Sequence, residues 1–155
     1  MEKRRKALRT IGRRDLVDLP GLHLIDIDAK VDTGAYTSAL HVKGVEAFEK
    51  EGEPWVRFKL DHPNHPAYKN KLFNMPVFAH KQIKSSSGQS ELRYVVRTGI
   101  LLFGKRYYAE FSLTDRSAMD FPVLLGRKLL YRKFVVDVTQ KNLSFKLKQK
   151  RKSKE

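Results

Sequence analysis

Asp32, Thr33 and Gly34 are the residues whose types and order offer the clearest chemistry. They follow a stretch with strand character, so the turn would present the Asp32 carboxylate while Gly34 allows a tight backbone and the close approach of a partner. A D-T-G triplet alone is common in ordinary turns. Its meaning therefore depends on the segments around it, VDTGAYTSALHV (31–42) and the downstream FPVLLGRKLL (121–130).

The sequence lacks the motifs that are typical of other catalytic mechanisms. Hydrolytic zinc sites often use H-E-x-x-H on a helix, which is absent here, and the five histidines are dispersed apart from His62 and His65 in a Pro-rich loop. No G-x-x-x-x-G-K-[ST] loop or G-x-S-x-G elbow occurs. We therefore expect no metal site, no cofactor and no ATP hydrolysis by this chain itself.

The elements that must position Asp32 are predicted to be short strands. Leu24 to Val31 alternates apolar and polar residues and leads directly into Asp32. Further segments rich in strand formers are 38–42, 54–60, 75–83, 92–103 and 106–113. The last two are separated by Gly104-Lys105, which favours a type II′ hairpin turn. Residues 61–71 carry two Pro and two Asn and indicate a surface loop.

Near the C-terminus, residues 121–132 predict an apolar strand, Gly126, and one or two helical turns. This is the only convincing helix in the pattern. Residues 134–138 and 143–147 are predicted to be two closing strands. Many short strands separated by turns indicate an all-β sandwich or small barrel.

The 155 residues fit one domain, and the net charge of +15 lies mainly at the two ends. Residues 1–14 hold seven Lys or Arg against Glu2, and residues 146–155 hold six against Glu155, so the ends carry +11. Such segments are usually solvated, although they can bind nucleic acid or an acidic protein. We divide the chain into a basic tail (1–10), a folded domain (11–147) and a second basic tail (148–155).

Composition also bears on location. The basic start is not followed by the apolar stretch of a secretory signal, and no apolar run approaches the roughly 20 residues of a membrane span. The chain has no Cys, which fits a reducing compartment. The expected location is the cytoplasm, without membrane association.

Three segments together resemble a known family: IGRRDLVDLP (11–20), AKVDTGAYTSALH (29–41) and LTDRSAMDFPVLLGRKLL (113–130). The D-T-G-A loop and the later G-R-x-L-L segment are similar to those of retropepsins, the aspartic peptidases with half a site per chain. The full set resembles the bacterial and archaeal retropepsin-like family labelled "ATP-dependent zinc protease". The resemblance implies an all-β, retropepsin-like closed barrel with one short C-terminal helix.

The resemblance also implies a mechanism, hydrolysis of peptide bonds in a protein or peptide substrate. Two carboxylates a few Å apart would share one proton, because like charges that close do not both ionise easily. One would act as general base on a water, and the other would donate to the scissile carbonyl oxygen. The chain has one D-T-G, so the second Asp32 would come from an identical chain in a homodimer.

Individual residues acquire roles by the same resemblance. Asp32 would be catalytic, Thr33 would link the two active-site loops across the dimer, and Gly34 would offer backbone contacts to substrate. Ala35 stands where pepsin-like enzymes have Ser, so a hydroxyl that favours the ionised pair is missing and we expect a near-neutral pH optimum. Gly126 and Arg127 would support the loop from beneath.

Two points remain open in this comparison. Many viral retropepsins have Asp after D-T-G-A, paired with the Arg of the G-R segment, whereas this chain has Tyr36 at that position. Arg127 therefore needs another partner, and the candidates are Asp15, Asp18 and Asp28. A Ser- and Gly-bearing segment one strand before Gly104 is the candidate flap, with the alternative of a plain surface hairpin: Ser86, Ser87, Gly88 and Gln89.

The resemblance also implies a partner, and the function has an alternative. Members of the family are associated with an ATP-grasp glutamate ligase, which makes that system a plausible partner. The alternative to a peptidase is a catalytically silent β-barrel module whose basic tails hold RNA, a ribosome or an acidic protein.

Overall fold

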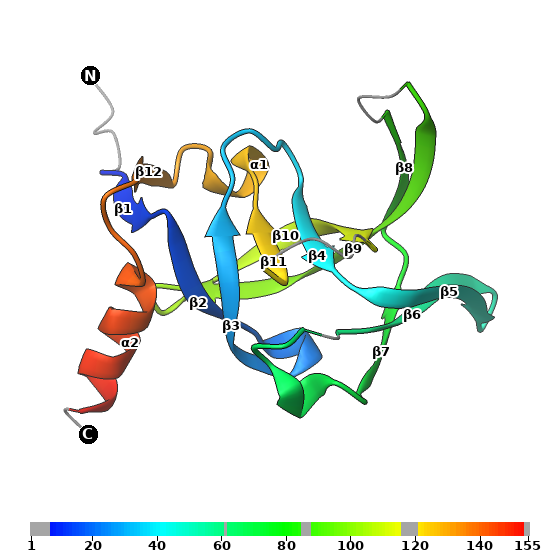
Figure 1. Ribbon diagram of the computed structural model, residues 1–155, viewed down its shortest axis with the longest axis horizontal. Coiled ribbons are helices and arrows are strands. Elements are labelled where there is room, and N and C mark those ends of the chain that lie inside the picture. Colours follow the sequence, from blue (N-terminus) through cyan, green and yellow to red (C-terminus); the bar gives the residue numbers. More distant parts are fainter. Residues whose placement is uncertain (1–6, 61, 85–87, 116–120, 154–155) are drawn as a thin grey trace, which may run out of the picture.

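The computed structural model describes residues 7–60, 62–84, 88–115 and 121–153. Within them, strands β10, β4, β11, β3, β2 and β9 form a ring that closes because β9 also pairs with β10 (Figure 1). The bounds are β2 (Arg14–Leu19), β3 (Leu24–Val31), β4 (Ser38–His41), β9 (Ser90–Leu102), β10 (Lys105–Thr114) and β11 (Val123–Leu125). The expected all-β, retropepsin-like closed barrel is confirmed.

Smaller units surround the barrel. β8 (Ala79–Lys84) pairs with β9 and extends the sheet, and β1 (Arg9–Gly12) pairs in parallel with β12 (Phe134–Asp137). A separate sheet has the order β5 (Lys43–Lys50), β6 (Glu53–Lys59) and β7 (Leu72–Pro76). The helices are α1 (Arg127–Leu130), α2 (Leu143–Lys152) and two 3₁₀ turns, Pro20–Leu22 and Pro66–Tyr68.

The path of the chain through three strands places Asp32. β11 lies between β3 and β4, parallel to β3 and antiparallel to β4. The chain leaves β3 at Val31 and returns in β4 at Ser38, so residues 32–37 must pass over the end of β11. The segment that follows β11 is then the natural support for this loop.

Apolar side chains fill the barrel with the alternation expected of strands. Val17 and Leu19 of β2 and Ile27 and Ala29 of β3 are fully buried. The alternation breaks at Ile25, which is 58% exposed. The neighbouring Asp26 has a φ of 53°, and the pairing of β2 with β3 shifts register at this point, as in a β-bulge.

The segment 143–147 was predicted to be a strand, and this prediction is wrong because these residues begin α2. Asp15, on β2, explains the difference. Its carboxylate accepts hydrogen bonds from the backbone N–H groups of Ser144 and Phe145 at 2.9 and 3.0 Å, which satisfies donors that a helix start leaves free. The helix continues through Lys152, so residues 148–152, assigned above to a tail, are helical.

Two other expectations differ in detail. The β9–β10 turn consists of Phe103 and Gly104, because Leu102 pairs with Lys105. Both turn residues have positive φ, 54° and 75°, which is the type I′ arrangement instead of type II′. The predicted strand 75–83 is divided between β7 and β8, which belong to different sheets.

Strands β1, β2 and β5 were not predicted. β5 is exposed along most of its length and so lacks the apolar alternation that would have marked it. None of the helices in the described parts of the chain is long and apolar enough to cross a membrane.

Candidate active site

The D-T-G loop begins where β3 ends and is folded tightly by its own backbone. The Asp32 N–H donates to the Leu125 carbonyl of β11 at 2.9 Å, which anchors the start of the loop. The Asp32 carboxylate accepts a hydrogen bond from the Gly34 N–H at 3.0 Å, and the Ala35 N–H donates to the Asp32 carbonyl at 3.2 Å. Asp32 is half-buried, so its carboxylate is held by the loop yet reachable from solvent.

The G-R segment supports the loop from behind. The backbone N–H groups of Arg127 and Lys128 donate to the carbonyls of Ala35 and Tyr36 at 2.8 and 2.9 Å. A Cβ on Gly126 would lie 2.7 Å from the Tyr36 carbonyl oxygen, closer than real contacts allow. Only glycine therefore fits where the segment passes the loop.

Ser38 and Arg127 add side-chain bonds to this support. The buried Ser38 hydroxyl accepts a hydrogen bond from the Gly126 N–H at 3.0 Å. The Arg127 guanidinium donates to the Thr33 carbonyl at 2.9 Å and lies over the Tyr36 ring, 5.9 Å from its centre. The loop from Thr33 to Tyr36 is thus fixed to α1 by both backbone and side chain.

The carboxylates considered as partners of Arg127 are all engaged elsewhere, so that expectation is wrong. Asp15 binds the start of α2, Asp18 forms an ion pair with Lys148 at 2.9 Å, and Asp28 contacts His65 at 3.0 Å. Arg127 instead donates to the backbone carbonyl of Thr33.

A hairpin stands where the flap was expected. β8 and β9 pair from Ala79–Val95 to Lys84–Ser90, so residues 85–89 connect them. Gly88 has a φ of 85°, a conformation that favours glycine, and Gln89 is exposed. Ser86 and Ser87 lie outside the described residues. The role of this hairpin as a flap stays a prediction.

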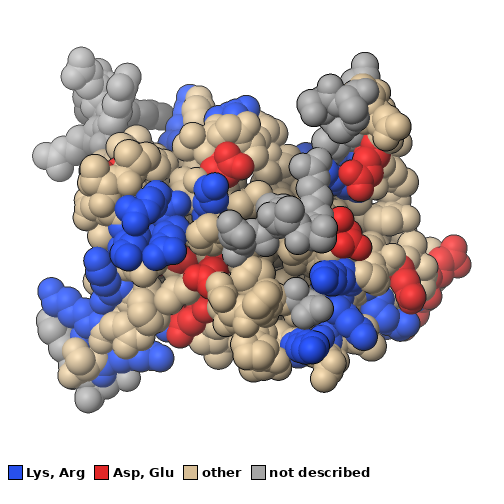
Figure 2. All heavy atoms as spheres, in the orientation of Figure 1, with Lys and Arg blue, Asp and Glu red and all other residues tan. Residues whose placement is uncertain are grey.

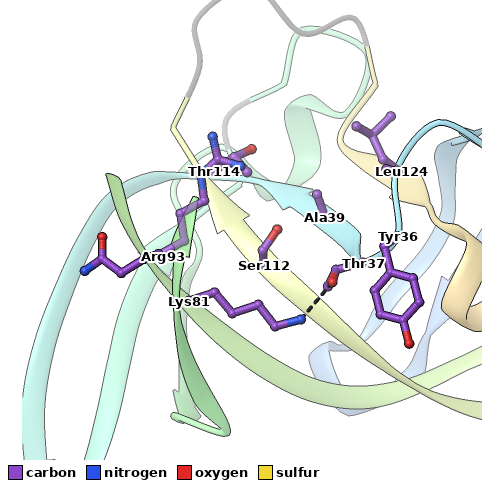
Figure 3. Close-up of a pocket in the computed structure, with 10 residues that line it drawn as sticks. Tyr36, Thr37, Ala39, Lys81, Arg93, Ser112, Thr114 and Leu124 are labelled. Carbon is purple, nitrogen blue, oxygen red and sulfur yellow. Dashed lines mark hydrogen bonds between the residues drawn. The ribbon is translucent and has the colours of Figure 1, made fainter. Parts of the chain in front are cut away.

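A cavity of about 450 Å³ separates this hairpin from the D-T-G loop (Figure 3). The loop contributes Ala35, Tyr36 and Thr37 to its lining, and the hairpin contributes Lys81 and Arg93. Figure 3 shows the Lys81 side chain extending to Thr37, whose hydroxyl accepts a hydrogen bond from the ammonium at 2.8 Å. The cavity is therefore lined by the D-T-G loop and by cationic side chains of β8 and β9.

Lys81 and Arg93 line the candidate site and were not predicted from the sequence. They form a directly opposed cross-strand pair, an arrangement that is unfavourable for like charges. Arg93 reaches Glu91 at 3.4 Å, but its buried Nε has no hydrogen-bond partner in the described structure. Each of the two strands that flank the candidate flap carries one of these cations. This pattern indicates a site only when the register of β8 and β9 is known, because the register pairs the two residues.

The histidines do not assemble a metal site in the described ranges. His62 and His65 face each other with ring centres 5.7 Å apart, and His65 contacts Asp28. Burial lowers the pKa of His41, although the Asp115 carboxylate acts in the opposite direction. No group of three or more His, Asp or Glu is placed to hold a metal ion in the part of the chain that the structure describes.

Comparison with known proteins supports the family assignment. A family model described as "Retropepsin-like aspartic endopeptidase RimB" matches residues 10–146. Two curated relatives are each named "Probable alpha-L-glutamate ligase". The relative from Shewanella pealeana is 40% identical over 131 residues, and that from Desulfotalea psychrophila is 36% identical over 132. Each match covers 84% of this chain but 28% of the relative, so the chain spans little more than a quarter of their length.

The fold also has a solved counterpart. The crystal structure of a Legionella pneumophila protein of unknown function superposes with a TM-score of 0.74 at 25% sequence identity. The match covers 89% of this chain and 99% of that protein. With the D-T-G loop, the G-R support and the family match over residues 10–146, the chain belongs to the RimB-like family of retropepsin-like aspartic endopeptidases.

Proposed function

We propose that this protein is an aspartic endopeptidase that works as a homodimer through paired Asp32 residues. The observation that carries the proposal is the half-buried Asp32 carboxylate, held by a loop that α1 fixes in place. The later residues of the same loop, Ala35 to Thr37, line the cavity of about 450 Å³. A carboxylate on a rigid, supported loop is suited to acid–base work, because catalytic groups must be held close to the productive geometry.

One chain supplies one such carboxylate, and the proposed mechanism needs two. In the dimer the two Asp32 groups face each other across the two-fold axis and hold one proton between them. The ionised member removes a proton from a water, which attacks the scissile carbonyl carbon. The protonated member donates to the carbonyl oxygen, and collapse of the tetrahedral intermediate breaks the C–N bond as the leaving amine takes up a proton.

Exposed apolar side chains provide a surface for the second copy. Tyr36 of the active-site loop is 57% exposed, Tyr131 after α1 is 68% exposed, and Val135 of β12 is 50% exposed. The elements that carry them lie at the same end of the molecule as the D-T-G loop (Figure 1). Covering this end with a second chain would bury these side chains and bring the two loops together.

The cationic side of the cavity favours an acidic peptide as the substrate. An anionic side chain bound between Lys81 and Arg93 would relieve their unfavourable opposition. The curated relatives are named as probable glutamate ligases, so peptides rich in glutamate are the substrates to test first. A ligase that adds glutamate to protein would then be the functional partner of this peptidase, and both would act in the cytoplasm.

Cleavage of glutamate-rich peptides in EDTA tests the proposal, with wild type compared with Asp32→Asn. Asn is nearly isosteric with Asp but cannot hold the shared negative charge, so we expect EDTA-resistant cleavage to disappear while the fold and the dimer persist. Equal cleavage by the two proteins would refute the proposed mechanism.

A second candidate follows from the length of the relatives. The matched segment is 28% of proteins named as ligases, which favours an accessory module that binds substrate for a ligase without cleaving it. In that case peptide binding would survive Asp32→Asn, and wild type would show no cleavage under any of the same conditions.

A further inference from the structure

The sheet β5–β6–β7 plays no part in the proposed catalytic site. Its cross-strand pairs place Lys43 beside Lys59, Glu46 beside Arg57, and Phe48 beside Trp55. The three partners on β6 share one face, because side chains alternate between the faces of a sheet. The three residues on β5 lie on that face as well, since a register shift between Lys43 and Glu46 takes up their odd spacing. Val56 and Phe58 of β6 point to the opposite face and are buried. The first face is therefore the outer face of the sheet.

A groove of about 600 Å³ runs along this outer face and is strongly cationic. Four cationic side chains and one carboxylate line it: Lys43, Arg57, Lys59, Lys69 and Glu46. In Figure 2 basic side chains gather over this part of the surface, at the lower right, while carboxylates lie toward the tip of the β5–β6 hairpin. The groove matches an extended polyanion better than a single small anion.

Aromatic rings adjoin the basic groove. Phe48 and Trp55 are half-buried, with ring centres 6.3 Å apart. Lys50 lies 4.4 Å from the centre of the Trp55 ring, and Arg57 lies 4.8 Å from that of Phe48. Arg57 is held in place by a 2.9 Å hydrogen bond to Asn74. Each ring thus lies against a cationic side chain on the outer face of the sheet.

We propose that the outer face of β5–β6–β7 binds single-stranded RNA. Phosphates would occupy the groove beside Lys43, Arg57 and Lys59, and unpaired bases would stack on Phe48 and Trp55. An acidic peptide would satisfy the charges but leave the rings unused, and a duplex would keep its bases stacked internally. The Glu46 carboxylate supplies an acceptor for a ribose 2′-hydroxyl, which DNA lacks. This site is independent of Asp32 and of the proposed peptidase activity.

Trp55 is the single tryptophan of the chain, so its fluorescence reports directly on the proposed site. The full-length protein is titrated with a single-stranded uridine 12-mer at several salt concentrations. We expect quenching of Trp55 by stacked bases. If each of the four cations that line the groove, Lys69 included, contacts one phosphate, log K should fall with log salt with a slope of about −2.8. The double variant Arg57→Gln/Lys59→Gln should make that slope shallower by about 1.4.

The matched control removes two cations elsewhere, in the double variant Lys150→Gln/Arg151→Gln on α2. It should keep the quenching and nearly the same slope. Phe48→Leu should weaken RNA binding about fivefold or more while leaving the salt slope unchanged, because it removes a stacking surface and no charge. Thermal melts of all variants identify any that fail to fold.

Four results would overturn the proposal. RNA binding without any change in Trp55 fluorescence would place the RNA elsewhere, and the wild-type titration alone decides this. Equal quenching and affinity for a thymidine DNA 12-mer would remove the case for RNA. Loss of binding in the α2 variant, with retention in the Arg57 and Lys59 variant, would move the polyanion site to the C-terminal helix. Polyphosphate and polyglutamate serve as anions that bind without stacking, and quenching by either would contradict the assigned role of the rings.

Discussion

Replacing Gly126 by Ala tests whether the D-T-G loop depends on the close passage of the G-R segment. The added Cβ would lie 2.7 Å from the Tyr36 carbonyl oxygen and 2.8 Å from the Thr37 carbonyl carbon. Both are backbone atoms of the loop, so neither can turn aside as a flexible side chain would. The loop and α1 must separate, which strains the bonds from Arg127 and Lys128 to the loop carbonyls.

The loss of stability in Gly126→Ala has two causes, overpacking and weakened hydrogen bonds. Overpacking a rigid site costs about 1–3 kcal/mol, and each weakened hydrogen bond about 1 kcal/mol. With both bonds weakened, we expect the free energy of unfolding to fall by about 3–5 kcal/mol, or Tm by about 6–20 °C for a chain of this size. Because misplacement of a catalytic group by about 1 Å costs about 100-fold in rate, kcat should fall by about that factor.

The assay combines thermal unfolding with peptide cleavage at saturating substrate. Gly99→Ala is the matched control, because a Cβ there meets only the flexible Arg106 side chain, 3.2 Å away, and the backbone φ is not in the left-handed region. The control should stay close to wild type in both measurements. Wild-type Tm and kcat in Gly126→Ala would refute the role assigned to this contact.

Three further substitutions test individual interactions. Lys81→Met removes the ammonium that binds Thr37, and KM for a glutamate peptide should rise about tenfold while KM for the matching glutamine peptide stays unchanged; an equal rise for both peptides would contradict an acidic subsite. Burial opposes the charge of Lys148, but the hydrogen bonds that its ammonium donates to Asp18 and Asp26 outweigh this effect and raise its pKa above 10.5. The stabilising contribution of Lys148 is therefore complete below pH 10.5 and is lost as pH rises through the raised pKa. In urea titrations, Lys148→Met should lower the free energy of unfolding by about 1 kcal/mol at pH 7 and by less at pH 11. A difference that does not depend on pH would contradict the ion-pair account. Burial lowers the pKa of His41 below 6.5, so the unfolded chain binds the proton more readily and the free energy of unfolding should fall as pH drops below 6.5. His41→Gln should make this fall shallower in urea titrations at different pH values. An unchanged pH dependence would exclude His41 as a cause of the loss of stability at low pH.

The sequence predicted the elements whose signals are local. Leu24 to Val31 reads as a strand from its own residues, and Asp32-Thr33-Gly34 with Gly126-Arg127 carries the family resemblance. The closed barrel and the passage of the D-T-G loop over the G-R segment agree with these expectations. Each depends on residues that are close in sequence or on a pattern already known from related proteins.

The features that escaped prediction depend on contacts between distant residues. The segment after Asn142 forms a helix because Asp15, far away in the chain, accepts hydrogen bonds from its first N–H groups. Arg127 binds the carbonyl of Thr33, and a backbone carbonyl leaves no mark in a sequence. Lys81 and Arg93 become a pair only through the register of β8 and β9.

The most direct test of the central claim is a subunit-mixing experiment with wild type and Asp32→Asn. The two proteins are refolded together in different ratios at constant total concentration, and EDTA-resistant peptide cleavage is measured. If each active site needs Asp32 from both chains, an equal mixture should retain about a quarter of the activity of the same amount of wild type, because only dimers of two wild-type chains are active. Retention of about half, in proportion to the wild-type chains present, would contradict a shared site.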